Sequence, residues 1–157
     1  MESLQYLDVE SLNLTNPMNI WLRAGLDSNL VKKTTVVSWM TMGVFKTREN
    51  LAKMKLIKNN YCLACDKNQT ENLSHLLLHC DFYAKIRDEY LPKLAILNQN
   101  FTVIMDNEPQ LIISILNPES QQLPESARLY CEKSFQLSRS FCYDLYKKRE
   151  KFYEMKS

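Results

Sequence analysis

Three cysteines and one histidine lie close together between Tyr61 and Cys80. They follow the spacing C-x2-C-x9-H-x4-C, and the residues are Cys62, Cys65, His75 and Cys80. Thiolate and imidazole ligands in this number suit tetrahedral Zn2+, and four protein ligands leave no open position for a substrate or a reactive water. Ordinary buried cysteines are the competing interpretation, but a histidine and a third cysteine at short range favour zinc. The spacing therefore predicts a closed, structural zinc site.

The fourth ligand has two candidates that are adjacent in the sequence. A helix opening at Thr70 or Asn72 would carry His75, and His79, four residues further on, would lie on the same helical face, as in H-x3-H fingers. Cys80 would serve instead if the helix ended or tightened at that point. We prefer Cys80 and keep His79 as the alternative.

The composition is that of one folded domain, or of one core with an appended helix. Of 157 residues, 45% are hydrophobic and 24% are charged, which is typical of neither a disordered chain nor a membrane protein. No run approaches the roughly 18 to 20 apolar residues of a membrane span, and Glu2 and Asp8 stand where a signal peptide would be basic. The five cysteines are an odd number. We therefore expect an intracellular protein, in the nucleus or cytoplasm, with reduced thiols and no membrane partner.

Apolar residues recur at helical spacing through most of the chain, and only two glycines are available for tight turns. A mainly α fold is therefore predicted. Helix starts are assigned at capping residues and prolines, and helix ends at glycine or proline. The predicted helices cover residues 17–25, 28–40, 47–55, 72–78, 82–91, 93–97, 109–117 and 124–155.

Three details of this assignment can be checked directly against the structure. Asp81 is expected to cap the following helix, which would let the preceding helix end at Cys80. Pro92 is expected to end the helix that Asp81 begins. Leu51 and Met54 are expected to turn inward, with Leu56 and Ile57 as further candidates.

The last predicted helix is long and amphipathic, and its apolar members are Leu129, Phe135, Leu137, Phe141, Leu145 and Phe152. Its end is basic, with Lys147, Lys148, Arg149 and Lys151, charges that also suit a helix C-terminus. We predict a helical domain over residues 1–118 that contains the zinc motif at 61–80. Residues 119–157 would form a polar linker and the long helix, packed on the same core.

The net charge of +2 is too small to indicate nucleic-acid binding by itself. Between residues 46 and 67, however, there are six basic residues and two acidic ones, a local excess of four positive charges. A solvated basic surface is the simpler interpretation of such a cluster. The candidates for contact with phosphates, or with a base in the case of the tyrosine, are Arg48, Lys53, Lys55, Lys58, Tyr61 and Lys67.

The residues around the motif resemble the region beyond the polymerase in reverse-transcriptase polyproteins of non-LTR (LINE-type) retrotransposons. The matching features are Gly43 with Thr47-Arg48, Cys62 and Cys65, then Glu71, Asn72, Leu73, His75 and Cys80, and finally Arg87. Met42 stands where these proteins usually have threonine. The resemblance implies a CCHC zinc knuckle whose ligands are Cys62, Cys65, His75 and Cys80, with His79 as a neighbour.

By this resemblance, the chain would be a nucleic-acid-binding module with a structural zinc that helps to hold template RNA or target DNA, with an upstream reverse-transcriptase domain as a further partner. An aromatic-x-Asp-Asp stretch and a carboxylate set suited to a nuclease are both missing, so we expect no enzyme activity. The alternative is a zinc-stabilised protein-interaction or purely structural domain. Self-association, and decay of the element, stay open.

Overall fold

The computed structural model describes residues 28–97, 106–117 and 128–156. Within these ranges the protein is mainly helical, and no β-strand occurs beyond one isolated antiparallel bridge between Tyr61 and Thr70. The predicted fold class is confirmed. None of the helices in these ranges combines the length and the apolar character needed to cross a membrane.

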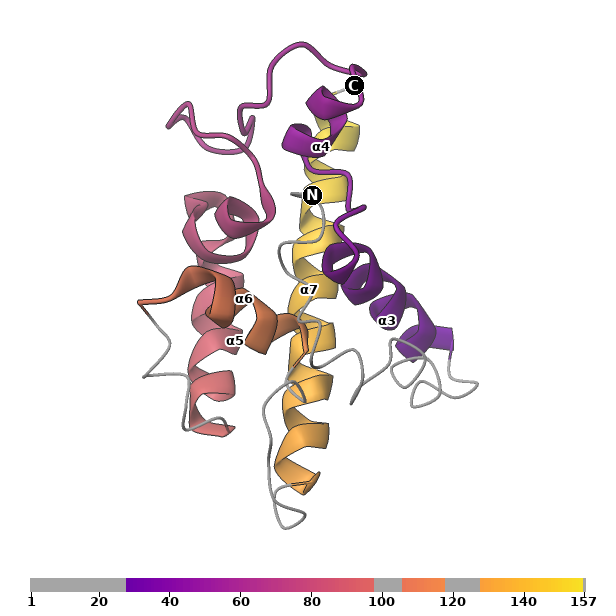
Figure 1. The fold of residues 1–157 in the computed structure, drawn as a ribbon, viewed down its shortest axis with the longest axis vertical. Coiled ribbons are helices and arrows are strands. Elements are labelled where there is room, and N and C mark those ends of the chain that lie inside the picture. Colours follow the sequence, from indigo (N-terminus) through magenta and orange to yellow (C-terminus); the bar gives the residue numbers. More distant parts are fainter. Residues whose placement is uncertain (1–27, 98–105, 118–127, 157) are drawn as a thin grey trace.

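The long C-terminal helix α7, Arg128–Lys156, is the element around which the others pack. Figure 1 shows it in the middle of the molecule, with α3, Ser28–Thr41, on one side and α5, Ala84–Leu97, on the other. Helix α6, Glu108–Leu116, contacts both α3 and α7. The long amphipathic helix predicted from the sequence is therefore present, and its buried residues pack with those of the other described helices.

The core consists of the apolar stripes that these helices turn toward one another. Buried members include Val37, Met40, Leu76, Tyr83, Leu94, Ile112, Ile115, Phe141 and Leu145. A fully buried aliphatic or aromatic side chain of this size contributes about 1.5–3 kcal/mol relative to an exposed one. Cys142 lies in the same core, where burial raises the pKa of its thiol to about 12. Its thiol is therefore protonated and behaves as a small apolar group.

Two helix starts have side-chain capping contacts, of which the one at Thr47 was predicted from the sequence. Thr47 caps the short helix α4, Arg48–Lys53, because its hydroxyl accepts a hydrogen bond from the Asn50 N–H at 3.2 Å. The Asn107 side chain caps α6 in the same way, and proline occupies the first turn.

Two expectations were wrong. Helix α5 does not end at Pro92 but continues through it to Leu97. Proline removes one backbone hydrogen-bond donor from the helix. Leu94, two residues after Pro92, is buried in the core, and we infer that this burial outweighs the lost hydrogen bond. Met54 and Leu56 do not turn inward but are 61% and 64% exposed. The reason is that α4 ends at Lys53, after which the chain turns at Lys55 with a left-handed φ of 61°.

Several predicted features lie outside the described residues. These are the helix over residues 17–25, the polar linker over 119–125, the domain boundary after 118 and the start of the last helix at 124. The side chain of Leu129, predicted to face the core, belongs to the same group.

Candidate metal centre and its surroundings

The two cysteines of the Cys-x2-Cys pair lie on a loop whose base is closed by backbone hydrogen bonds. The Cys62 N–H donates to the Gln69 carbonyl at 2.7 Å, and the Glu71 N–H donates to the Asn60 carbonyl at 2.8 Å. Asn68 turns the loop with a left-handed φ of 52°, a conformation that asparagine tolerates well. Residues 60–62 and 69–71 are therefore hydrogen-bonded to each other, and both cysteines lie on the loop that they close.

The histidine is presented by a short helical segment that follows the loop. The Asn72 side chain accepts a hydrogen bond from the His75 N–H at 2.8 Å, as expected for a helix opening at this residue. The segment then forms one π turn, η2, His75–His79, in which the Cys80 N–H donates to the His75 carbonyl at 2.8 Å. A π turn closes over five residues instead of four, so Cys80 returns to the side of His75. The helix ends at Cys80 as expected, but it widens there and does not tighten.

The four predicted ligands come together in one cluster. Their ligand atoms all lie within 4.8 Å of one another, with 3.8 Å between the Sγ atoms of Cys62 and Cys80 and 3.4 Å between Cys65 Sγ and His75 Nε2. Zinc bond lengths of about 2.3 Å to sulfur and about 2.0–2.1 Å to nitrogen give tetrahedral edges of roughly 3.8 Å and 3.5 Å. The donor set and its spacing thus fit a four-coordinate zinc ion.

The electrostatics of the cluster favour a cation. The neighbouring Cys80 thiol lowers the pKa of Cys62 to about 5, whereas the Cys62 sulfur and burial together raise the pKa of Cys80 above its usual range. Two thiolates at this distance repel each other, so one sulfur keeps its proton unless a positive charge lies between them. A divalent cation would let both sulfurs ionise.

Helix α5 and the turn before it hold Cys80 in place. The buried Arg87 guanidinium donates to the Cys80 carbonyl, which gives this residue of the resemblance a structural role. Asp81 starts a 3-10 turn, η3, Asp81–Tyr83, and pairs with Lys67 of the cysteine loop at 2.7 Å. The expectation that Asp81 caps the next helix was wrong, because its carboxylate is directed to this lysine across the loop.

The structure does not bring His79 into the cluster. Its imidazole contacts the Glu108 carboxylate in the first turn of α6, and the other Glu108 oxygen accepts from Ser74 Oγ at 2.9 Å. The Ser74 hydrogen bond and the histidine hold the pKa of Glu108 below its ordinary value. His79 thus connects η2 to α6 at the surface, which is why four-residue spacing alone is a poor guide here.

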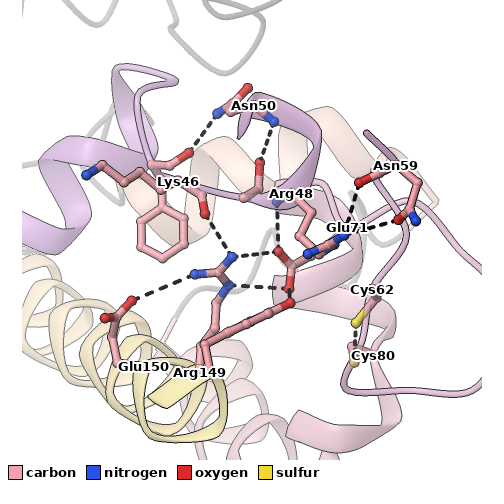
Figure 2. A network of polar contacts seen from close by, with 12 residues as sticks. Lys46, Arg48, Asn50, Asn59, Cys62, Glu71, Cys80, Arg149 and Glu150 are labelled. Atoms are coloured by element: carbon pink, nitrogen blue, oxygen red, sulfur yellow. Dashed lines mark hydrogen bonds and ion pairs between the residues drawn. The ribbon is translucent and has the colours of Figure 1, made fainter. Parts of the chain in front are cut away.

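A buried carboxylate lies directly after the cysteine loop, and its partners could not be predicted from the motif. Glu71 is fully buried, and Figure 2 shows its carboxylate between Arg48 and Arg149. It accepts hydrogen bonds from the Arg48 N–H at 2.9 Å, from Arg149 Nη2 at 2.8 Å and Nε at 3.3 Å, and from the Tyr153 hydroxyl at 3.2 Å. The sequence signal was weak, a single arginine among the lysines that end α7. Arginine is the residue that suits a buried, forked ion pair.

The six candidates for nucleic-acid contact lie on α4, on the loop after it and on the cysteine loop. Lys55, Lys58 and Tyr61 are exposed, and among the described residues neither lysine has an ion-pair partner. Lys53 pairs with Glu49 at 2.9 Å, and Lys67 pairs with Asp81. The Arg48 guanidinium donates to the backbone and side-chain oxygens of Asn59, both at 3.1 Å.

A shallow polar depression of about 510 Å³ lies beside the cluster. It is lined by Lys67, Gln69, Thr70, Asn72, Ser74, His75 and His79. Tyr61 is paired with Thr70 across the loop, and residues directly opposite in an antiparallel pair project to the same face. The exposed Tyr61 side chain therefore projects to the same face as Thr70, which lines the depression.

Fold and site together define a mainly helical protein with a Cys3His cluster suited to hold a metal ion. Residues 9–86 match a family model described as zinc-binding in reverse transcriptase. This segment, which includes the whole cluster and ends within α5, belongs to that zinc-binding family, as the resemblance implied. Zinc is accordingly the metal that the cluster suits. Comparisons with curated proteins and with solved structures find no match.

Proposed function

We propose that Cys62, Cys65, His75 and Cys80 hold one structural zinc ion, and that the unit ordered by this ion is a non-catalytic nucleic-acid-binding module. The spacing of the four ligand atoms, all within 4.8 Å of one another and at 3.8 Å and 3.4 Å for two of the pairs, is the observation that supports the ligand set. A bound zinc would stabilise the cysteine loop and η2, since structural zinc in finger peptides contributes an apparent ~10–16 kcal/mol at neutral pH. With four protein ligands it would have no open position for chemistry.

The nucleic-acid surface is formed by the exposed groups that the zinc unit holds in place. Lys55 and Lys58 offer ammonium groups to phosphates, and the exposed ring of Tyr61 offers a face on which a base can stack. Lys53 and Lys67 are half-exposed in their surface ion pairs, and such pairs are weak enough for a phosphate to compete with the carboxylate. Arg48 would contribute mainly by holding Asn59 and its loop.

Unpaired nucleotides fit this surface better than a duplex. Tyr61 is paired with Thr70, which lines the polar depression together with the amide side chains of Gln69 and Asn72. A base stacked on the tyrosine would place its edge or its sugar near these groups, which requires the base to be unpaired and turned out of its stack with neighbouring bases. RNA and DNA single strands are both compatible with this arrangement.

The test is fluorescence anisotropy with labelled single-stranded RNA, single-stranded DNA and duplex DNA at several salt concentrations. Binding should weaken steeply with salt, and Lys55→Glu with Lys58→Glu should reduce affinity at least about tenfold for every sequence. The matched control is Lys85→Glu with Lys93→Glu, which makes the same charge change on α5. Salt-insensitive binding, or an equal loss in both double variants, would contradict the proposal.

A protein-interaction domain is the second candidate, and a specific observation favours it. Val44, Met54, Leu56 and Leu63 are exposed apolar side chains on or near α4 and the cysteine loop. Exposed apolar groups of this kind are typical of surfaces that bind another protein. In that case the chain would bind an adjoining reverse-transcriptase domain and would show no affinity for nucleic acid even at low salt.

A further inference from the structure

We propose that Arg149 and Tyr153 of α7 are positioning residues for the metal centre, acting through Glu71. Both lie outside the segment of residues 9–86 that matches the zinc-binding family. The proposal rests on the four-ligand zinc site proposed above. It goes beyond that site because it makes the zinc affinity depend on a helix that contributes no ligand.

Glu71 lies between the loop that carries Cys62 and Cys65 and the helical segment that presents His75 and Cys80. Its N–H donates to the Asn60 carbonyl and so closes the loop that carries both cysteines of the pair. Its carbonyl accepts from the Glu49 N–H at 3.1 Å, and the next residue, Asn72, accepts the His75 N–H with its side chain. Any displacement of Glu71 therefore moves Cys62 and Cys65 relative to His75 and Cys80.

The Glu71 carboxylate needs α7. Three of the hydrogen bonds it accepts come from this helix, two from Arg149 and one from Tyr153, and the fourth comes from the Arg48 N–H. The side chains of Glu71 and Arg149 are 0% and 6% exposed, so water cannot replace the guanidinium. A buried carboxylate that loses its cation must find solvent or take up a proton, and finding solvent means opening the loop.

Arg149 also contacts the segment that precedes α4. Its Nη2 donates to the Lys46 carbonyl at 2.8 Å, and its guanidinium lies 5.6 Å from the Phe45 ring and 4.5 Å from the Tyr153 ring. One planar group thus fixes the segment before α4 and the carboxylate of the cysteine loop (Figure 2). A compact ammonium could not make this forked set of contacts.

Zinc affinity should therefore reflect the docking of α7. When a binding-competent arrangement is only partly populated, the apparent affinity falls by that populated fraction. With Arg149 and Tyr153 in place, the loop and η2 are held close to the tetrahedral spacing before the metal arrives. Without them, zinc binding must also restore that arrangement, and the apparent affinity for zinc is lower.

The experiment compares the full chain with Arg149→Met and with Lys151→Met, an exposed lysine two residues away that gives the same change of charge. Zinc affinity is measured by competition with a chromophoric chelator, and zinc release by mixing with excess chelator, at a temperature where circular dichroism shows each protein folded. We expect Arg149→Met to lose at least tenfold in affinity and to release zinc faster, with Lys151→Met unchanged. Cobalt(II) spectra should show a distorted site in Arg149→Met alone.

A purely structural role for Arg149 would lower the stability of the metal-free and zinc-loaded protein equally and leave zinc affinity unchanged in the folded state, which would overturn the inference. If Arg149→Met does not fold, Tyr153→Phe removes only one hydroxyl, and it should release zinc severalfold faster than wild type; an unchanged rate would overturn the inference. A wild-type chain that binds no zinc would instead refute the proposed metal site itself.

Discussion

The Arg149 guanidinium lies 2.8 Å from the Glu71 carboxylate, although the two residues are 78 positions apart in the chain. Burial by itself would lower the pKa of Arg149, but the hydrogen bond and the charge of Glu71 raise it. Arg149 therefore stays protonated in the folded protein. This pair connects the cysteine loop to the long helix, and the proposed dependence of the metal centre on α7 comes from it.

Loss of the Arg149 side chain should destabilise the whole protein. Arg149→Met leaves the Glu71 carboxylate buried without its cation, a change that typically costs about 3–5 kcal/mol. The free energy of unfolding, from urea titrations of the zinc-loaded protein, measures this cost. Lys151→Met serves as control and should stay within about 0.5 kcal/mol of wild type. Equal effects in the two variants would mean that the buried pair contributes no more than a surface charge.

Metal analysis should find one zinc per chain. Cys62→Ser and Cys80→Ser should each abolish or strongly reduce zinc content, because each removes a thiolate from a four-ligand set. His79→Ala should keep its zinc, since the imidazole contacts Glu108 and not the cluster. Loss of zinc in His79→Ala together with retention in Cys80→Ser would show that the histidine is the fourth ligand.

Removal of the Thr47 cap should destabilise α4. Thr47→Ala leaves the Asn50 N–H without its partner, which typically costs about 1 kcal/mol. Thr47→Ser keeps the hydroxyl and should recover most of that loss. The free energy of unfolding in denaturant distinguishes the two variants, and equal destabilisation by alanine and serine would assign the effect to packing of the buried methyl group.

Stability should fall as the pH rises above about 10. Burial, and then the hydrogen bond to Asp144 at 2.6 Å, raise the pKa of Tyr90 above its ordinary value. Above the unfolded-state pKa of about 10, the unfolded chain has lost a proton that the folded chain retains, so the free energy of unfolding decreases with pH. Tyr90→Phe should flatten this decrease between pH 9 and pH 11 in denaturant titrations. An identical pH slope in wild type and Tyr90→Phe would exclude this tyrosine as a contributor.

If nucleic acid stacks on Tyr61, the ring should matter more than the hydroxyl. Tyr61→Ala should weaken binding to single strands by about 1–3 kcal/mol, whereas Tyr61→Phe should bind nearly as wild type. Anisotropy titrations at one fixed salt concentration give the comparison. Leu63→Ala is the control, as it shortens another exposed side chain of the same loop without removing a ring. A similar loss in Leu63→Ala would indicate a general effect on the loop.

Local spacing was sufficient for much of the architecture. The helices over α3, α6 and α7 were predictable because apolar residues recur at helical intervals and because Pro109 marks a start. Pro92 was misjudged because a proline rule describes an isolated helix, whereas α5 is held by packing against α7. The prediction that Asp81 caps the next helix was wrong because its carboxylate pairs with Lys67 across the loop instead of accepting a backbone N–H.

The sequence by itself determined that this chain would be helical and would carry a Cys3His set suited to zinc, since ligand types and spacings are local properties. Only the tertiary structure decided which of two adjacent residues faces the cluster, because that depends on one π turn and on Glu108 drawing His79 away. It also decided that Arg149, apparently one more charge at a helix end, is buried against Glu71. Long-range pairing of this kind leaves no periodic trace in a single sequence, because the partners meet only when the core is formed.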